Sequence, residues 1–251
     1  FERGLDYTVS LQPGIANIAG EKTVRTVRKI VNFPHLDPQI KFDQTGVILP
    51  FSGQRSISFQ AVNQDSLIVT VQRIFASNLG QFIQVNELEG PSNKNYDYRD
   101  MRRVATEVYR KVLKGTAEYD KWERMELVFD DLFEKERKAA FVVNVEGRNR
   151  HGYPLRSYKL LISTDLGITA KWAENRMYVF VSSIMNSTPV AGSKVVLYSQ
   201  QLQEIASGVS DSDGRVVFKG DHENALHIAA EKGQDRSYMR VFRDSWRTNT
   251  F

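Results

Sequence analysis

The feature of this sequence that most constrains its fold is a regular recurrence of short strand-like segments. In residues 158–242, seven such segments follow one another at a spacing of roughly ten residues, with turns between them. They are rich in β-branched and aromatic residues, which favour strands over helices. This pattern predicts a β-sandwich. The expected strands are 158–164, 176–184, 194–200, 203–210, 215–220, 225–233 and 237–242, and 165–168 bridges the first two.

The first part of the chain shows a similar but less regular pattern. Strands are expected at 7–11, 22–33, 46–50, 56–62, 66–75, 81–88 and 139–148. The short polar link at 63–65 predicts a hairpin between two of them, and 89–98 is expected to be a polar loop. Val104, Val108 and Val112 stand at helical spacing, which predicts a helix over 102–115, although its valine and threonine content favours a strand. The acidic segment 125–136 is expected to form one or two helical turns.

One motif, "GVSDSDGRVVFKG" at 208–220, could be read as half of a calcium loop. Placing Gly214 at position 6 of an EF-hand loop puts Asp213 and Asp211 at positions 5 and 3. Positions 1 and 12 then fall on Val209 and Gly220, whose side chains cannot coordinate a metal. The alternative is a tight hairpin turn, because Asp213 and Gly214 tolerate positive φ and strand-forming residues follow them. We favour the turn.

Composition excludes several kinds of chemistry. The 251 residues contain no cysteine, so disulfides, zinc–thiolate sites and cysteine nucleophiles are excluded within this stretch. No apolar run is long enough for a membrane span. The chain opens at Phe1 without a leader, which suggests an internal piece of a longer protein. The net charge of +4 is spread out, and its densest basic stretch, 22–29, is expected to be a strand with one solvated basic face. We therefore expect no nucleic-acid partner.

No catalytic, cofactor-binding or metal-ligating residue is predicted. His222 and His227 stand five apart in a strand-like segment, which does not fit the four-residue spacing of a helical zinc motif. Asp130 and Asp131 are neighbours in sequence, so they would not face each other on a helix. An aromatic-rich stretch could stack on sugars, but core filling at a sheet edge is the simpler interpretation; its members are Tyr96, Tyr98, Tyr119 and Trp122. Known nucleotide-binding and nucleophile motifs are absent.

Several stretches resemble the macroglobulin-like domains of bacterial alpha-2-macroglobulins. The strongest lies at 157–220, where "STDLGITAK" (163–171) looks like the opening segment of such a domain. The segment "MYVFVSSIMNSTPVAGSKVVLY" (177–198) looks like two of its strands, and 225–241 looks like its closing hairpin. Residues 42–84 resemble the start of the preceding domain, chiefly through the asparagine of "AVN" and the segment "NLGQF". If the resemblance holds, 102–113 is a strand.

The resemblance implies an all-β chain of tandem macroglobulin-like β-sandwiches, of the fibronectin or immunoglobulin type. Residues 1–43 would be the last strands of a preceding domain, 44–156 one sandwich and 157–251 another. Family members are large proteins of the bacterial envelope, often lipoproteins, that trap proteases after cleavage of a bait segment and often capture them through a Cys–Gln thioester. Without cysteine, this stretch cannot hold the thioester.

The resemblance therefore implies scaffold within a protease inhibitor rather than an enzyme. Target proteases would be partners of the parent protein, and we expect no cofactor. Contact with a membrane would come only through a lipid anchor outside these residues. The protein would lie in the periplasm or at the outer surface of the cell, and it would be a monomer. The alternative is a β-sandwich stalk of a bacterial surface protein, adhesin or carbohydrate-binding protein, since such domains share architecture without sharing function. The structural residues singled out are Asp213 and Gly214 for one turn, and Pro189 and Gly192 for the neighbouring loop.

Overall fold

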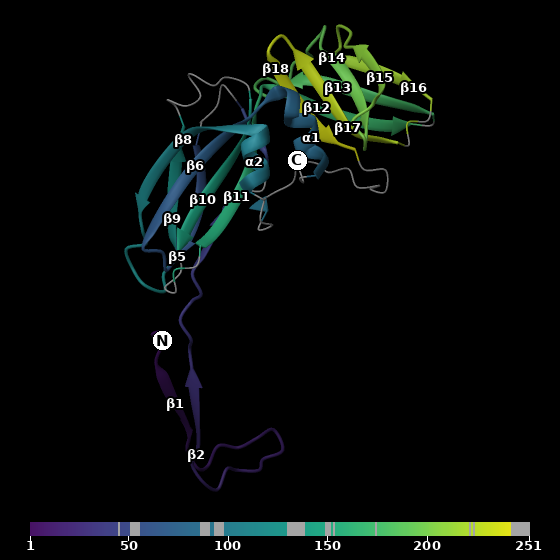
Figure 1. Cartoon of the computed structure of the whole chain (residues 1–251). Coiled ribbons are helices and arrows are strands. Elements are labelled where there is room, and N and C mark those ends of the chain that lie inside the picture. Colours follow the sequence, from purple (N-terminus) through teal and green to yellow (C-terminus); the bar gives the residue numbers. More distant parts are fainter. Residues whose placement is uncertain are drawn as a thin grey trace.

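The chain folds into a two-stranded ribbon followed by two β-sandwiches (Figure 1). The computed structural model describes residues 1–44, 46–50, 56–85, 91–92, 98–129, 139–148, 152, 154–173, 175–220, 222 and 224–241. Nearly all strand pairs in it are antiparallel, so the predicted all-β class of tandem sandwiches is confirmed. Within the described residues, neither α-helix has the length and apolar character needed to cross a membrane.

The N-terminal ribbon pairs β1 (Asp6–Leu11) with β2 (Val27–Asn32), and it extends away from the first sandwich. Its strands alternate, so one face gathers Tyr7, Val9, Leu11, Val27 and Val31, while the other is mostly polar. Several of these apolar side chains are exposed to solvent. Two strands alone are marginally stable in water. This ribbon therefore has the pattern of two strands from a larger sheet.

The first sandwich packs a three-stranded sheet, in the order β3-β5-β9, against a six-stranded sheet, in the order β4-β11-β10-β6-β8 with β7 beside β11. Alternate residues point between the sheets, for example Phe59 on β5, Val69 on β6 and Phe141 on β10. The strand bounds are β3 (Gln39–Phe42), β4 (Ile48–Leu49), β5 (Ser56–Val62), β6 (Ser66–Ile74), β7 (Pro91–Ser92), β8 (Ala105–Lys114), β9 (Glu123–Val128), β10 (Ala140–Arg148) and β11 (Pro154–Ser163).

Two strands of this larger sheet are buried on both faces. Leu161 points between the sheets, whereas Tyr158, Leu160 and Ile162 point outward into a second apolar cluster. That cluster is completed by α1 (Leu79–Val85) and α2 (Tyr98–Val104), which lie between β6 and β8. The short 3-10 helix η1 (Ala76–Asn78) precedes α1 and has no buried residue. The double-sided burial explains the consecutive apolar residues 140–143 of β10 and 160–162 of β11, where a strand with one solvated face would alternate.

Lys159 is an unusual member of this interior, since it is only 1% exposed. Its ammonium group donates hydrogen bonds to the backbone carbonyls of Gln44, at 2.8 Å, and Gly46, at 2.6 Å. Burial lowers its pKa to about 8. The side chain thereby ties the link between β3 and β4 to β11.

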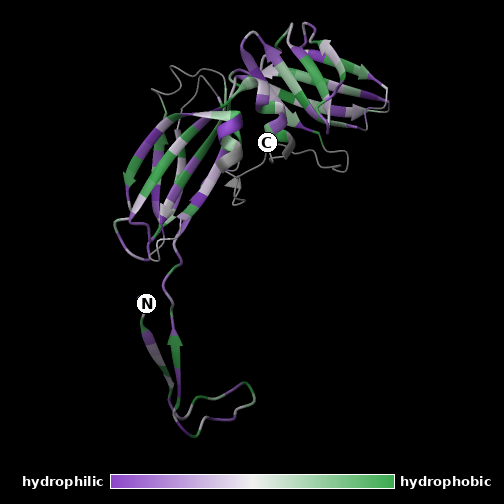
Figure 2. Ribbon diagram, in the orientation of Figure 1, coloured by the Kyte–Doolittle hydropathy of each residue, from purple (hydrophilic) through white to green (hydrophobic). Residues whose placement is uncertain are grey.

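The second sandwich packs a sheet in the order β12-β13-β16 against a sheet in the order β15-β14-β17-β18. Its core alternates in the same way, with Val179, Leu197 and Ile228 fully buried between the sheets. Figure 2 shows this alternation as green bands along the strands. The strand bounds are β12 (Leu166–Ala173), β13 (Arg176–Ser183), β14 (Lys194–Ser199), β15 (Glu204–Val209), β16 (Arg215–Lys219), β17 (Ala225–Lys232) and β18 (Asp235–Arg240).

Two predicted hairpins are in fact crossings between sheets. β5 pairs with β3 and β9 whereas β6 pairs with β10 and β8, so the link at 63–65 carries the chain from one sheet to the other. Likewise β15 pairs with β14 and β16 pairs with β13. The turn at 211–214 is nevertheless tight, because the Gly214 N–H donates to the Asp211 carbonyl at 3.0 Å. A turn motif indicates where the chain reverses, but the pairing partners depend on the whole sandwich.

Four segments adopt a different secondary structure from the one predicted. The segment 81–88, predicted as a strand, begins within α1. The helix predicted from periodicity at 102–115 ends at Val104, and the rest is β8, as the family resemblance implied. The acidic segment 125–136 begins in β9, and 130–138 lie outside the described residues. Finally, 165–168 do not merely bridge two strands but open β12. In 102–115, the pairing of β8 with β6 overrides the helical periodicity.

The predicted boundary between the sandwiches separates residues that pair in one sheet. A division at 157 assigns 158–163 to the second sandwich, yet these residues are hydrogen-bonded to β10 in the first. Similarly, 39–42 form β3 and pair with β5 rather than belonging to the ribbon.

Candidate functional site at the two joints

Two joints connect the three parts of the chain, and they are built from different chemistry. The ribbon joint is a polar cluster where the ribbon meets the first sandwich. Its centre is Asp120, whose carboxylate accepts hydrogen bonds from the Leu36 N–H at 2.8 Å and the Asn63 amide at 3.1 Å. His35 Nδ1 lies 2.5 Å from the same carboxylate. Asn63 also donates to the Leu36 carbonyl at 2.7 Å and accepts from the Asp120 N–H at 2.7 Å.

The backbone at this joint is unusual at two positions. Asn63 and Asp120 both adopt positive φ, 54° and 59°, a conformation that asparagine and aspartate tolerate better than other residues with side chains. Desolvation acts to raise the pKa of Asp120, but the hydrogen bonds from His35, Asn63 and Leu36 outweigh it and lower the pKa to about 2. The carboxylate is therefore charged at neutral pH.

His35 is the residue that reaches from this cluster to the ribbon. Gly4 lies directly against its ring, and a Cβ added to Gly4 would fall 2.3 Å from His35 Nε2. On its other side the ring meets Tyr119 edge-on, with centroids 5.0 Å apart. The contact between the ribbon and the first sandwich is therefore small. It consists of polar groups and one edge-on contact between the rings of His35 and Tyr119.

The sandwich joint is apolar by comparison, and α1 lies at its centre (Figure 1). Tyr238 of β18 packs against the cluster that contains Leu79 and Phe82 of α1. The side chain of Leu202, in the turn after β14, lies beside Gly80, since a Cβ added there would be 3.5 Å from both Leu202 methyl groups. The α1 segment therefore fills the space between the sandwiches.

A buried hydrogen-bonded unit anchors the start of the second sandwich at this joint. Thr164 and Asp235 are both almost completely buried, and the Thr164 hydroxyl donates to Asp235 Oδ1 at 2.6 Å. The Asp165 N–H donates to Asp235 Oδ2 at 3.3 Å, and the Leu166 N–H donates to the Thr164 hydroxyl at 3.0 Å. The chain leaving β11 is thereby fixed to the β17–β18 hairpin.

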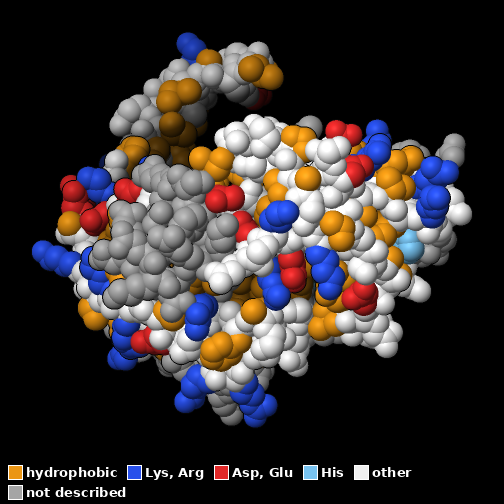
Figure 3. All heavy atoms as spheres, turned by 90° about the horizontal axis from the view of Figure 1, so that it is seen from above, with side chains coloured by type: hydrophobic (Ala, Val, Ile, Leu, Met, Phe, Trp, Pro, Cys, Tyr) orange, Lys and Arg blue, Asp and Glu red, His pale blue; other side chains and the backbone are white. Residues whose placement is uncertain are grey.

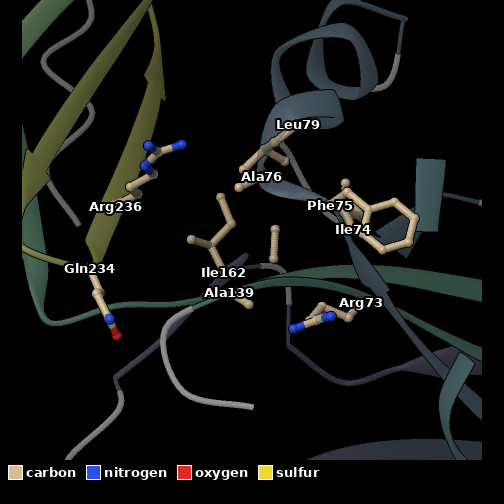
Figure 4. A pocket seen from close by; sticks show the side chains of 10 residues that line it. Arg73, Ile74, Phe75, Ala76, Leu79, Ala139, Ile162, Gln234 and Arg236 are labelled. Carbon is tan, nitrogen blue, oxygen red and sulfur yellow. The ribbon is translucent and has the colours of Figure 1, made fainter. Parts of the chain in front are cut away.

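A cleft of about 300 Å³ opens at the sandwich joint (Figure 4). One wall comes from the first sandwich and is mostly apolar, with Ile74, Leu79 and Ile162 among its residues, but it also includes Arg73. Gln234 and Arg236 of the β17–β18 hairpin face it from the second sandwich. Arg236 is engaged by Glu231, at 3.0 Å. The cleft presents no nucleophile, acid or base among its lining residues, and its chemistry is that of a packed interface.

His227 lies on the face of β17 that also carries Ala229, the register partner of Tyr238. It is 1% exposed, and neither ring nitrogen has a hydrogen-bond partner in the described part of the chain. Desolvation, with a smaller effect of Arg240, lowers its pKa to about 4. His222 contacts Phe218 instead, with ring centroids 6.1 Å apart. No group of three or more acidic or histidine side chains placed to hold a metal occurs among the residues described.

The predicted structural residues meet at one end of the second sandwich. Gly214 has φ of 70°, as its turn requires, and Gly192 has φ of 69°. A Cβ on Gly214 would lie 2.3 Å from the Val181 carbonyl and 3.2 Å from Pro189. The Asp211 carboxylate accepts hydrogen bonds from the Asp213 and Arg215 N–H groups, so it is used within the turn.

The aromatic stretch divides among different places. Trp122 lies under the Lys41 ammonium group, 4.3 Å from the ring centroid, and Tyr119 meets His35 edge-on at the ribbon joint. Tyr96 and the side chain of Tyr98 lie outside the described residues, as do Asp130 and Asp131.

Chemical reasoning from the sequence assigned no role to the joint residues, although it singled out Tyr119, whereas the family resemblance covers several of them. The asparagine of "AVN" is Asn63, the segment "NLGQF" is the start of α1, and the opening "TDLG" contains Thr164. His35 and Asp120 lie outside the motifs that carry the resemblance.

Comparisons with known proteins agree with this architecture. A model described as "Bacterial alpha-2 macroglobulin MG2 domain" matches residues 41–153, and one described as "Bacterial alpha-2-macroglobulin MG3 domain" matches 163–251. The alpha-2-macroglobulin of Escherichia coli (strain K12) is 24% identical over 231 residues, which are 91% of this chain and 14% of that protein. The chain thus spans about one seventh of the length of this curated relative.

Two solved structures of the same relative share the fold. One is native alpha-2-macroglobulin from Escherichia coli spanning domains MG0-NIE-MG1, with a TM-score of 0.70 and 20% identity over 96% of this chain and 76% of that one. The other is trypsin activated alpha-2-macroglobulin from Escherichia coli, with a TM-score of 0.62 and 21% identity over 81% of this chain and 14% of that one.

Proposed function

The chain belongs to the bacterial alpha-2-macroglobulin family, and we propose that it serves as a rigid scaffold segment of a protease trap. The observation that carries the proposal is the sandwich joint. Helix α1 and Tyr238 form an apolar contact between two complete sandwiches, and the buried Thr164–Asp235 unit fixes the chain that runs between them. A segment of this kind moves as one rigid body, so it transmits a conformational change of the parent protein from one end of the segment to the other.

We propose boundaries that follow the strand pairing. The ribbon of residues 1–38 belongs to a preceding sandwich, the first complete sandwich runs from β3 to β11, and the second begins at Thr164. The exposed apolar face of the ribbon supports the first point.

In the parent protein these domains form part of a cage in the bacterial envelope. Any thioester lies elsewhere, because this stretch contains no cysteine. We place the bait segment outside these residues as well. Target proteases are partners of the parent protein, which acts as a monomer carried by a lipid anchor outside these residues. We assign the segment no catalytic activity and no cofactor.

Trypsin is the first protease to test, since a trypsin-activated form of a relative has been solved. The parent protein would be incubated with trypsin, and cleavage of a large protein substrate compared with cleavage of a small chromogenic peptide. Loss of the first activity with retention of the second is expected for a caged, active protease. If both activities persist, trapping of trypsin is refuted and a stalk or adhesin becomes the better interpretation.

A joint variant links the assay to this segment. Tyr238→Asp in the parent protein is expected to weaken trapping, because it places a charge in the apolar sandwich joint. Tyr178→Asp is the matched control, on β13 in the opposite sheet of the second sandwich. Equal trapping by the wild type and Tyr238→Asp, with the joint shown to be disrupted, would contradict a scaffold role for the joint.

A further inference from the structure

The loop between β1 and β2 is long, yet it is folded on itself. We call residues 12–26 the finger. Within it the Gly14 N–H donates to the Thr23 carbonyl at 2.8 Å, and the Thr23 N–H donates to the Ile15 carbonyl at 3.0 Å. Ala16 and Lys22 form an isolated bridge. Figure 1 shows the finger projecting from the end of the ribbon that lies farthest from the sandwiches.

The tip of the finger is organised by one side chain. Asn17 Oδ1 accepts hydrogen bonds from the N–H groups of Ala19 and Glu21, both at 3.0 Å, and its amide donates to Glu21 Oε2 at 2.9 Å. Gly20 turns the chain at φ of 84°, and a Cβ there would meet nothing within 4 Å. The tip is therefore ordered by its own contacts and not by packing against the rest of the chain.

This ordered tip displays apolar side chains. Ile18 is fully exposed, Val24 is 91% exposed, and Ile15 is half exposed. Ordering a loop costs conformational entropy, and these side chains recover none of it by burial within this chain. Figure 3 shows hydrophobic side chains along the arm that projects beyond the sandwiches.

A basic collar stands next to the apolar tip. Lys22, Arg25 and Arg28 are all exposed, and none of them forms an ion pair with another described residue. Arg28 lies on the polar face of the ribbon, opposite Ser10. Glu21 is the acidic residue within the same stretch, and it is bonded to Asn17. An apolar tip beside unpaired cations fits a surface that is apolar inside and anionic at its boundary.

We propose that the finger docks on the surface of an anionic phospholipid bilayer. Ile18 and Val24 enter the boundary between headgroups and acyl chains, while the basic collar lies over the lipid phosphates. The apolar face of the ribbon is a separate feature, and we have assigned it to the preceding sandwich. The contact does not depend on protease trapping, and it adds a second membrane contact to the anchor expected outside these residues.

The test is sedimentation of the 251-residue chain with vesicles. Vesicles of phosphatidylcholine alone are compared with vesicles containing about 30% phosphatidylglycerol, each at low and at high salt. Binding is expected with the anionic vesicles at low salt, and it should weaken as salt is added. Each cation near an anionic surface contributes about a five-fold gain in partitioning. The double variant Lys22→Ala and Arg25→Ala is therefore expected to bind about 25-fold less.

Ile18→Asp tests the apolar part without threatening the fold, because Ile18 contacts only solvent. It is expected to bind several-fold less than the wild type. The matched control is Val112→Asp, an exposed valine on β8 flanked by Lys111 and Lys114. The control should bind like the wild type. The proposal is overturned if the wild type fails to bind anionic vesicles at low salt, or if the finger variants bind as well as the control.

Discussion

Gly214 stands where the structure has no room for a side chain. Its φ of 70° is unfavourable for any residue with a Cβ, and the Val181 carbonyl would lie 2.3 Å from that atom. The Gly214 carbonyl accepts the Val181 N–H at 2.8 Å, so the turn is bonded to β13 as well. Any other residue at this position would therefore meet both an unfavourable backbone conformation and a steric clash.

Replacement of Gly214 by valine is expected to destabilise the second sandwich by on the order of 1–3 kcal/mol. Chemical denaturation followed by fluorescence would measure the loss. Gly233→Val is the matched control, since Gly233 has φ of 61° but nothing within 4 Å of its added Cβ. An equal loss in both variants would show that the contact with Val181 plays no part.

His227 makes stability depend on pH. Its pKa is lowered to about 4 in the folded chain, from 6.5 when unfolded, because burial disfavours the charged ring. Above pH 6.5 both states are neutral at this site. As pH falls from 6.5 to 4, the unfolded state takes up a proton that the folded state does not, so the free energy of unfolding decreases, by at most about 3 kcal/mol.

Unfolding by urea at a series of pH values would reveal this slope. His227→Gln removes the titrating group while keeping a polar side chain of similar length, and it is expected to flatten the curve between pH 6.5 and 4. An unchanged slope in the variant would assign the pH dependence to other groups.

Residues whose role is local were predictable from the sequence. Gly214 and Gly192 were chosen from turn chemistry alone, and both have positive φ. Asn63 and Asp120 share that conformation, but their partners lie 27 to 85 residues away in the chain. No local pattern predicts such contacts, and only the family resemblance pointed to one of the two residues.

At the scale of elements, α1 shows how packing decides between helix and strand. The sequence predicts a strand at 81–88, where Phe82, Ile83 and Val85 are residue types that favour strands. In the structure Leu79, Phe82 and Ile83 stand at helical spacing and are all buried against β10 and β11. The opposite change occurs in β8, where sheet pairing with β6 overrides helical periodicity. Short segments carry too little local preference to resist such packing.

Phe82→Ala is expected to destabilise the chain by about 3 kcal/mol, because it empties part of the cluster between the sandwiches. Gln81→Ala, on the exposed side of the same helix, is the control and should cost well under 1 kcal/mol. Equilibrium denaturation of both variants would test whether α1 contributes packing. Similar small losses would show that α1 merely covers the sheet.

The ribbon joint depends on a few polar contacts that a single substitution can remove. Asp120→Ala is expected to speed hydrogen exchange at the Leu36 amide by roughly an order of magnitude, since that N–H loses its acceptor. Asp37→Ala is the control, an exposed carboxylate in the same loop. Unchanged exchange in Asp120→Ala would mean that the ribbon is held by other contacts.

At the scale of the whole molecule, the two joints differ in what holds them. The ribbon joint is a partly exposed polar cluster, whereas the sandwich joint is a buried apolar contact reinforced by Thr164 and Asp235. Apolar burial around a helix restrains orientation over a wider area than a few hydrogen bonds do. We therefore expect the two sandwiches to move together and the ribbon to move relative to them.

The most direct test of the rigid scaffold is a distance measurement across the sandwich joint. The chain has no cysteine, so Lys111→Cys on β8 and Thr169→Cys on β12 provide two unique sites for spin labels. Double electron–electron resonance should give one narrow distance distribution, which broadens when Tyr238→Asp is added. A broad distribution without that substitution would contradict a rigid joint, and with it the proposed scaffold role.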